Sequence, residues 1–251
     1  MMNLSNWKEQ MKERPLYGCF VTWASPTVCE FVASMGFDFT LIDNEHGVMN
    51  EETLENMVRA SQAEGVPAVI RIPQGIYQYV QKSLDMGANG IQVPLVNTAE
   101  YMEQIVQLSN FPPEGKRGTA YQTRAAGYGL VKDKRAYLKK ANETKFVSVQ
   151  IETVEAVKNI DSILQVEGID CCFIGPGDLS SSMQLPYGDP RVNEVIDECI
   201  VKIARAGKIP GLLVGSAEAA KHAEELGARY IVVAENNCMS TGARSFLDSV
   251  R

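Results

Sequence analysis

The sequence has little of what marks several large classes of protein. It contains no apolar run approaching the roughly 18 residues of a membrane span, so we expect no transmembrane helix. Its first fourteen residues are polar and charged and include no signal-peptide core, so we expect a cytoplasmic protein. The six cysteines form no CxxC pair, which argues against a zinc site or a disulfide framework.

Positive charge is in the minority. The chain carries 24 Lys and Arg against 31 Asp and Glu, a formal net charge of -7, so neither nucleic acid nor anionic membrane is an expected partner. The one basic run, residues 132–140, has helical spacing and is typical of a solvated helix face. No P-loop, GxSxG or Rossmann glycine motif follows a predicted strand.

What the chain does contain is a regular alternation of short apolar runs and amphipathic segments. The apolar runs predict buried parallel strands at Tyr17–Trp23, Phe39–Asp43, Ala68–Ile72, Gly90–Pro94, Phe146–Ile151, Asp170–Ile174, Gly211–Val214 and Tyr230–Ala234. Helices are predicted at Pro26–Met35, Glu51–Glu64, Ile76–Met86, Ala99–Leu108, Val154–Val166, Pro190–Ala206, Ala217–Leu226 and Met239–Val250. Glycines that stop helices are expected at Gly36, Gly65, Gly87, Gly168, Gly207 and Gly227.

Eight strand–helix units favour a closed (β/α)8 TIM barrel over an open sheet. No linker interrupts the pattern, so residues 1–251 are predicted to form a single domain, opened by an extra helix at Leu4–Glu13. The longest irregular stretch runs from residue 110 to 131 and includes Pro112-Pro113 and several glycines. It is either an active-site lid or part of a subunit interface, or else a passive insertion.

In a barrel the chemistry collects where strands end and the following loops begin. Glu152 and Asp178 follow neighbouring predicted strands, and two carboxylates there repel unless a proton or a cation intervenes. With no Cys or His beside them, Mg or Mn suits the pair better than Zn. The alternative is that each carboxylate caps the helix that follows it.

Arg71 and His46 also follow predicted strands. A buried arginine needs a partner, so Arg71 either binds a substrate oxyanion or pairs with Asp43 or Glu45, or does both. His46 lies among charged residues and is a candidate for proton transfer, although a lone histidine at a strand end is more often structural. His222 falls on a predicted helix face and is expected to be inert. Lys145 and Lys208 precede their strands, which disfavours a Schiff-base aldolase.

Three segments resemble the HpcH/HpaI aldolase family, the metal-dependent class II pyruvate aldolases of the phosphoenolpyruvate/pyruvate barrel superfamily. They are LIDNEHG (residues 41–47), VQIET (149–153) and VEGIDCCFIGPGDLS (166–180), and PPEGKRG (112–118) in the long loop supports them. The likeness runs from about residue 17 to residue 236. It implies a homo-oligomer, a trimer or hexamer, in which the last helix is exchanged between subunits, with Arg124 and its neighbours near a subunit boundary.

The resemblance also implies roles for individual residues. Glu152 and Asp178 match the metal ligands, and Gln150 matches a substrate-contacting position. Gly177 and Asp178 match the backbone that holds the pyruvate carboxylate. The family often has Ala where Gly177 stands, a change that should loosen the loop slightly.

The same comparison supplies the catalytic groups. Arg71 matches the residue that stabilises the enolate, and His46 matches the catalytic base. Asp85 matches a residue thought to raise the basicity of that base, although its sequence context is that of an ordinary helical carboxylate.

The implied activity is reversible, Mg-, Mn- or Co-dependent retro-aldol cleavage of a 4-hydroxy-2-oxo acid. The products are pyruvate, formed through a metal-stabilised enolate, and an aldehyde whose identity the sequence leaves open. Tyr121, Arg124 and residues 214–216 are weak candidates for selecting that aldehyde. Two rivals remain: a citrate-lyase-like enzyme acting on a CoA thioester, and a non-catalytic barrel that binds 2-oxo acids.

Overall fold

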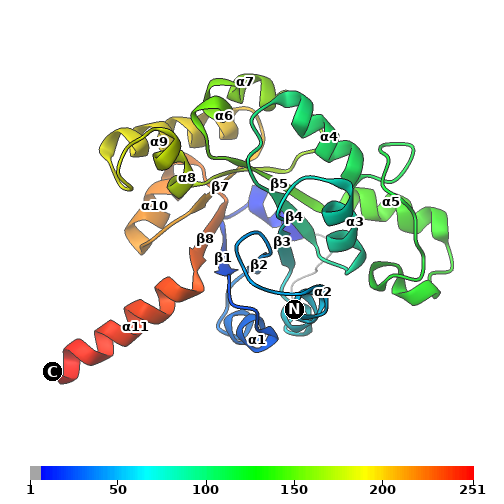
Figure 1. Cartoon of the computed structure of the whole chain (residues 1–251), viewed down its shortest axis with the longest axis horizontal. Helices are drawn as coiled ribbons and strands as arrows, with labels where there is room; N and C mark the ends of the chain where they lie inside the picture. Colours follow the sequence, from blue (N-terminus) through cyan, green and yellow to red (C-terminus); the bar gives the residue numbers. More distant parts are fainter. Residues whose placement is uncertain (1–6) are drawn as a thin grey trace.

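The computed structural model describes residues 7–251, and within them eight parallel strands close into a barrel in sequence order, β1 pairing with β8 (Figure 1). The strands are β1 (Leu16–Val21), β2 (Phe39–Asp43), β3 (Ala68–Arg71), β4 (Gly90–Val93), β5 (Phe146–Ile151), β6 (Cys171–Ile174), β7 (Ile209–Leu213) and β8 (Tyr230–Ala234). The predicted (β/α)8 fold is confirmed. None of the helices between Trp7 and Arg251 is both long and apolar enough to cross a membrane.

Helices surround the barrel. They are α1 (Pro26–Ser34), α2 (Glu51–Ala63), α3 (Tyr77–Asp85), α4 (Ala99–Ser109), α5 (Lys134–Thr144), α6 (Val154–Lys158), α7 (Ile160–Ile163), α8 (Pro176–Ser182), α9 (Pro190–Arg205), α10 (Ala217–Leu226) and α11 (Glu235–Val250), with the 3-10 helices η1 (Trp7–Lys12) and η2 (Arg124–Gly129). The predicted stop glycines all have positive φ, as at Gly227 with φ 113°, because glycine takes this left-handed conformation without a steric penalty.

The structure differs from the predicted elements at three helices. The helix expected over Val154–Val166 breaks at Asn159, whose side chain donates to the Asn97 carbonyl and so competes with the helical backbone. Helix α8 is absent from the predicted helices, although Pro176 at its first position suits a helix start. Of the helix expected at Leu4–Glu13, η1 covers Trp7–Lys12, and residues 4–6 lie outside the described residues.

Aromatic rings fill the amino-terminal end of the barrel. Phe39, Phe146 and Tyr230 each begin a strand and point inward, and the rings of Phe39 and Tyr230 stack with centroids 4.3 Å apart. Trp7 of η1 closes this end, with its ring centroid 4.9 Å from that of Phe146. Gly18 makes room for the stack, since a Cβ there would stand 2.1 Å from the Phe39 ring.

Candidate active site

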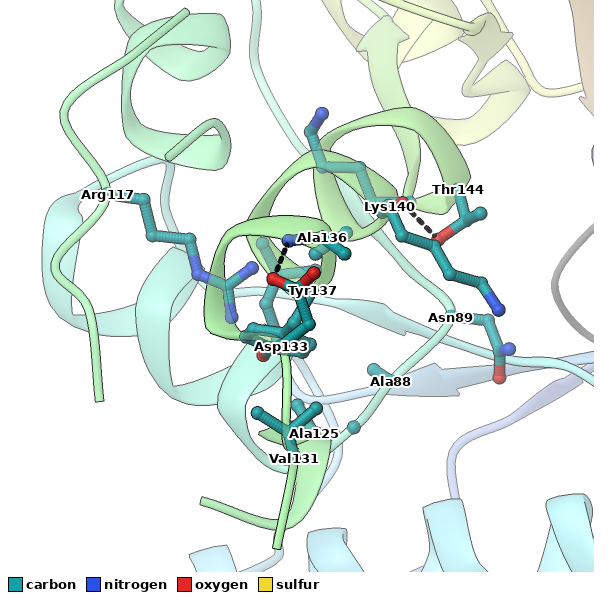
Figure 2. A pocket seen from close by; sticks show the side chains of 14 residues that line it. Ala88, Asn89, Arg117, Ala125, Val131, Asp133, Ala136, Tyr137, Lys140 and Thr144 are labelled. Carbon is teal, nitrogen blue, oxygen red and sulfur yellow. Dashed lines mark hydrogen bonds between the residues drawn. The ribbon is translucent and has the colours of Figure 1, made fainter. Parts of the chain in front are cut away.

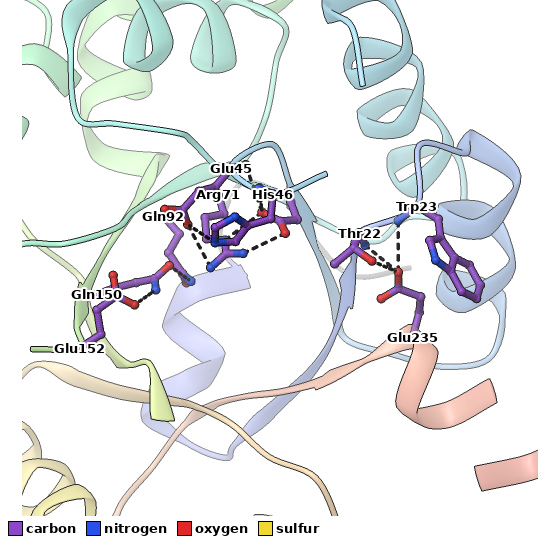
Figure 3. Close-up of polar contacts among 10 residues, drawn as sticks. Thr22, Trp23, Glu45, His46, Arg71, Gln92, Gln150, Glu152 and Glu235 are labelled. Atoms are coloured by element: carbon purple, nitrogen blue, oxygen red, sulfur yellow. Dashed lines mark hydrogen bonds and ion pairs between the residues drawn. The ribbon is translucent and has the colours of Figure 1, made fainter. Parts of the chain in front are cut away.

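Polar side chains occupy the other end of the same barrel interior. Because side chains alternate along a strand, the residues that follow the inward-facing aromatics at every second position also point inward. Toward the carboxyl ends these positions become polar, and they hold Asp43, Arg71, Gln92, Gln150 and Glu152, all of them buried. Figure 3 shows four of them, Arg71, Gln92, Gln150 and Glu152, together with Glu45 and His46.

Arg71, at the end of β3, is held by two carboxylates. Its Nε and Nη2 donate to the two oxygens of Asp43 at 2.9 and 2.8 Å, and Nη1 lies 3.0 Å from Glu45 Oε2. The guanidinium also sits 4.6 Å from the centroid of the Phe20 ring. Arg71 therefore pairs with both of the partners that the sequence suggested. Residues 7–251 engage three of its five N–H groups, which leaves two for an oxyanion in the mouth.

Glu152, just past β5, is 2% exposed. Its Oε1 accepts a hydrogen bond from the Leu95 amide at 2.7 Å, and its Oε2 accepts one from the Gln150 side chain. Burial, together with repulsion from Asp178, raises the pKa of Glu152 to about 7. The carboxylate is therefore poised to exchange a proton for a cation near neutral pH.

A directional chain of amides orients Glu152 from within the barrel. Ser148 Oγ donates to Gln92 Oε1 at 3.2 Å, and Gln92 Nε2 donates to Gln150 Oε1 at 3.1 Å. Gln150 then has its amino group turned toward Glu152. The sequence prediction missed Ser148 and Gln92, although their signal was visible as polar residues at alternate positions inside buried strands.

Asp178 lies on the same rim, in the first turn of α8. It is exposed, and its charge acts on both Glu152 and Glu45. Gly175 starts this turn directly against Glu152, because a Cβ on Gly175 would lie 2.5 Å from Glu152 Oε2. The amides of Gly177 and Asp178 belong to the helix start, where backbone N–H groups lack intrahelical acceptors. Glu152 is not a helix cap, since Thr153 caps α6.

His46 stands at the edge of the mouth, in a turn after β2. Asp43 Oδ1 accepts hydrogen bonds from the Glu45 and His46 amides at 3.1 and 3.3 Å, which shapes the turn. The His46 side chain is 69% exposed, and its Nε2 lies 3.9 Å from Glu45 Oε2. The imidazole is thus free to meet a ligand.

Asp85 lies apart from this group. It ends α3, and its carboxylate accepts a hydrogen bond from Arg117 at 2.7 Å. Within residues 7–251 no hydrogen bond or ion pair joins Asp85 to His46, and its predicted influence on His46 stays a prediction. The structure brings His46, Arg71, Gln150, Gly177, Glu152 and Asp178 to one rim.

The two carboxylates suit a hard divalent cation. Among the described residues no group of three or more His, Cys, Asp or Glu side chains gathers to hold a metal ion. Mg²⁺ and Mn²⁺ accept such a sparse set, since Mg²⁺ is commonly bound by one or two carboxylates and keeps several waters. The repulsion between Glu152 and Asp178 is the cost that a cation would remove. The residues present therefore fit a divalent ion completed by water or substrate.

The long loop lies on the flank of the barrel. Arg124 donates to the Met86 carbonyl at 3.0 Å and to Gln62 at 2.7 Å, which fastens η2 to α2 and α3. The loop and α5 enclose a cavity of about 600 Å³ (Figure 2). Ala88 and Asn89, at the amino-terminal end of β4, line this cavity. It is therefore separate from the rim that carries Arg71 and Glu152.

Known proteins resemble this chain along nearly its whole length. The sequence profile of the HpcH/HpaI aldolase/citrate lyase family matches residues 16–235. A 2-keto-3-deoxy-L-rhamnonate aldolase of Salmonella gallinarum is 36% identical over 245 residues, which cover 96% of this chain and 91% of that protein.

Solved structures agree with these sequence matches. An HpcH/HpaI aldolase/citrate lyase family protein from Burkholderia cenocepacia is 31% identical with a TM-score of 0.91, covering 98% of this chain and 99% of that one. The citrate synthase SbnG is 30% identical with a TM-score of 0.87, covering 99% and 98%. The predicted resemblance and the predicted class of carbon–carbon lyase are confirmed.

Proposed function

Because this chain belongs to the HpcH/HpaI aldolase/citrate lyase family, we propose that it cleaves a 4-hydroxy-2-oxo acid reversibly into pyruvate and an aldehyde. The observation that carries the proposal is that the buried guanidinium of Arg71 and the carboxylates of Glu152 and Asp178 lie on one rim. This grouping suits a reaction in which negative charge develops on a substrate oxygen. A citrate-lyase-like activity on a CoA thioester is not better supported.

The 2-oxo acid end of the substrate binds between α8 and β3. The amides of Gly177 and Asp178 donate to the substrate carboxylate, as backbone N–H groups at a helix start commonly do. A divalent cation, Mg, Mn or Co, held by Glu152 and Asp178 would supply a Lewis acid beside the keto oxygen. Gln150 keeps Glu152 in place and has one further N–H for the substrate.

Bond cleavage moves charge toward Arg71. As the C3–C4 bond breaks, its electron pair forms the pyruvate enolate, and the two free N–H groups of Arg71 stabilise the oxygen that gains this charge. His46 takes the proton of the C4 hydroxyl, so that C4 leaves as the aldehyde. Protonation of the enolate at C3 then gives pyruvate.

For the aldehyde half of the substrate, we propose a chemical class and no single compound. Relatives named 2-keto-3-deoxy-L-rhamnonate aldolase make 2-keto-3-deoxy sugar acids the first candidates. Residues 214–216 follow β7 and so lie at the carboxyl end of the barrel. Tyr121 and Arg124 lie on the flank of their own barrel, so a role in specificity requires them to reach a neighbouring subunit.

A homo-oligomer, a trimer or hexamer, is part of the same proposal. Helix α11 extends away from the barrel in Figure 1. Met239, Phe246 and Val250 on this helix are each more than half exposed, an apolar surface that a second subunit would cover. We take residues 1–251 to be one aldolase domain.

Two assays test the proposed function. Mg²⁺-loaded protein should cleave members of a panel of 4-hydroxy-2-oxo acids and release pyruvate. It should also exchange the methyl protons of pyruvate with deuterium, which a barrel that merely binds 2-oxo acids does not do. Cleavage of malyl or citramalyl thioesters without cleavage of any 4-hydroxy-2-oxo acid would refute the proposal in favour of the CoA-dependent rival.

A further inference from the structure

Glu235 is a buried carboxylate on the far side of the mouth from Glu152. It is the first residue of α11, directly after β8, and is 4% exposed. Its Oε1 accepts three hydrogen bonds: from the Thr22 amide at 2.7 Å, the Thr22 hydroxyl at 2.6 Å and the Trp23 amide at 3.1 Å (Figure 3). A single carboxylate oxygen thus holds the two residues that follow β1.

The second oxygen of this carboxylate has no partner among residues 7–251. Glu235 Oε2 is buried and accepts no hydrogen bond from any of them. A buried polar atom without a partner costs free energy, and most proteins avoid it. An apolar side chain at this position would avoid that cost but would lose the three hydrogen bonds of Oε1, so these three contacts point to a specific use.

The segment that Glu235 holds supports the turn carrying His46. Gly47 lies close to the chain after β1, since a Cβ on Gly47 would stand 3.0 Å from the Thr22 carbonyl oxygen and 2.2 Å from that of Asp43. The approach leaves no room for a side chain at residue 47. A displacement of Thr22 would therefore change the space available to Gly47, the residue next to His46.

We propose that Glu235 is a positioning residue for His46. By fixing Thr22 and Trp23 through its three hydrogen bonds, it holds the Thr22 carbonyl against Gly47 and so sets where the imidazole stands over the mouth. The importance of this for catalysis rests on the role of His46 in the proposed function, whereas the structural link does not.

The neighbouring Asn237 provides a matched control. It lies in the same first turn of α11, and its side chain donates to the Gly215 carbonyl at 2.8 Å, which joins the helix to the chain after β7. Within residues 7–251, no hydrogen bond joins the Asn237 side chain to Thr22 or Trp23. Its loss should perturb the helix start comparably without moving His46.

The experiment compares Glu235→Ala, Glu235→Gln and Asn237→Ala. Since the chain has two histidines, the His46 ring signal in a ¹H–¹³C spectrum of histidine-labelled protein is assigned with a His222→Gln variant. Glu235→Ala should shift or broaden the His46 signal, and Asn237→Ala should leave it in place. Glu235→Gln retains an acceptor oxygen for the three donors, so it should restore the wild-type signal.

Kinetics supply the second readout. Glu235→Ala should lower kcat about 10-fold or more, because small misplacements of a catalytic group are costly. KM for the 2-oxo acid should change by less than about twofold, because that end of the substrate binds across the mouth. Asn237→Ala should keep kcat within about twofold of wild type.

Two results would overturn the proposal. One is a His46 signal in Glu235→Ala that matches wild type. The other is a lower kcat together with a higher KM and a weaker Mn²⁺ affinity, which would indicate general disruption of the active site. If Glu235→Ala does not fold, Thr22→Val removes one of the three donors and should shift the same signal by less. Absence of aldolase activity in the wild type would refute the proposed function, while the spectral comparison would still decide the structural link.

Discussion

The two ends of the barrel are built by the same strands from different residues. Strand β5 begins with Phe146, which packs in the aromatic cluster under Trp7, and leads to Gln150 and Glu152 at its other end. The amino-terminal end is filled by rings, whereas the carboxyl-terminal end holds buried charges and a chain of amides. Inside the barrel, large apolar side chains therefore fill mainly the amino-terminal end, and the carboxyl-terminal end carries polar groups suited to chemistry.

Burial acts on charge in the same way at both ends. It lowers the pKa of Lys145, just before β5, to about 8 and raises the pKa of Glu152, just after it, to about 7. Glu152, however, lies near another carboxylate, Asp178, and their repulsion creates a demand for a cation. Substitutions at one end alone can test whether the amino-terminal end serves stability and the carboxyl-terminal end serves catalysis.

The largest expected effect is on turnover, from Arg71→Ala. Removal of a group that stabilises developing negative charge should lower kcat about 10²–10³-fold. Steady-state kinetics with a cleaved 2-oxo acid, beside Mn²⁺ binding that survives the change, would check this. Arg71→Lys keeps the charge but cannot hold Asp43 with two parallel hydrogen bonds, so its kcat should lie between those of the wild type and Arg71→Ala. Near-normal turnover in Arg71→Ala would remove Arg71 from the mechanism.

At the opposite end, Trp7→Ala should reduce stability with little effect on turnover. Loss of a fully buried tryptophan should lower the free energy of unfolding by about 3–5 kcal/mol. At roughly 2–4 °C per kcal/mol for a chain of this size, Tm should fall by about 6–20 °C. Calorimetry checks Tm, and kcat below the transition should stay within about twofold. Trp7→Phe keeps a ring in the cluster and should cost far less, whereas a large loss of kcat in the folded Trp7→Ala protein would contradict this separation of stability from catalysis.

Two glycines on one loop should behave differently. An alanine Cβ at Gly175 would collide with Glu152, whereas one at Gly177 would have no atom of the described residues within 4 Å. Gly175→Ala should therefore weaken Mn²⁺ binding about 10-fold, as changes around metal ligands commonly do. Gly177→Ala should stay within about twofold of wild type. Equal affinities for the two variants, measured by titration calorimetry, would show that Glu152 does not depend on this close approach.

The last expected effect is the pH dependence of stability arising from Lys145. Between pH 8 and 10.5 the unfolded chain holds a proton on this lysine and the folded chain does not. Folding then releases a proton, so this residue makes the protein more stable as pH rises through that window. Urea unfolding at several pH values should show this rise in the wild type relative to Lys145→Met. Parallel curves for the two proteins would argue against a buried Lys145.

Much of the scaffold could be predicted because its signals are local. The bounds of β2, β5 and β8 match the predicted ones, since each is a short run of apolar residues flanked by polar ones or glycine. Positive φ at the helix-stopping glycines followed from the same local rules. The break at Asn159 could not be foreseen, because it depends on a carbonyl of Asn97, 62 residues away.

The candidate site was predictable only in part. Arg71, Glu152 and Asp178 stand out as charged residues after apolar runs. Gln92 and Ser148 lie inside strands, and only the closure of the barrel shows that they meet Gln150. The contacts of Glu235 join opposite ends of the chain, so no local pattern reveals them. Asp85 was proposed through family resemblance, and in this structure it pairs with Arg117.

Manganese binding tests the central claim most directly, that Glu152 and Asp178 together hold the ion that activates the substrate. Mn²⁺ affinity can be measured by electron paramagnetic resonance in the wild type, Glu152→Gln and Asp178→Asn. We predict that each substitution weakens binding at least about 10-fold, and that a chelator abolishes wild-type cleavage until Mg²⁺, Mn²⁺ or Co²⁺ is restored. Wild-type affinity in both variants, or full activity in excess chelator, would contradict the account.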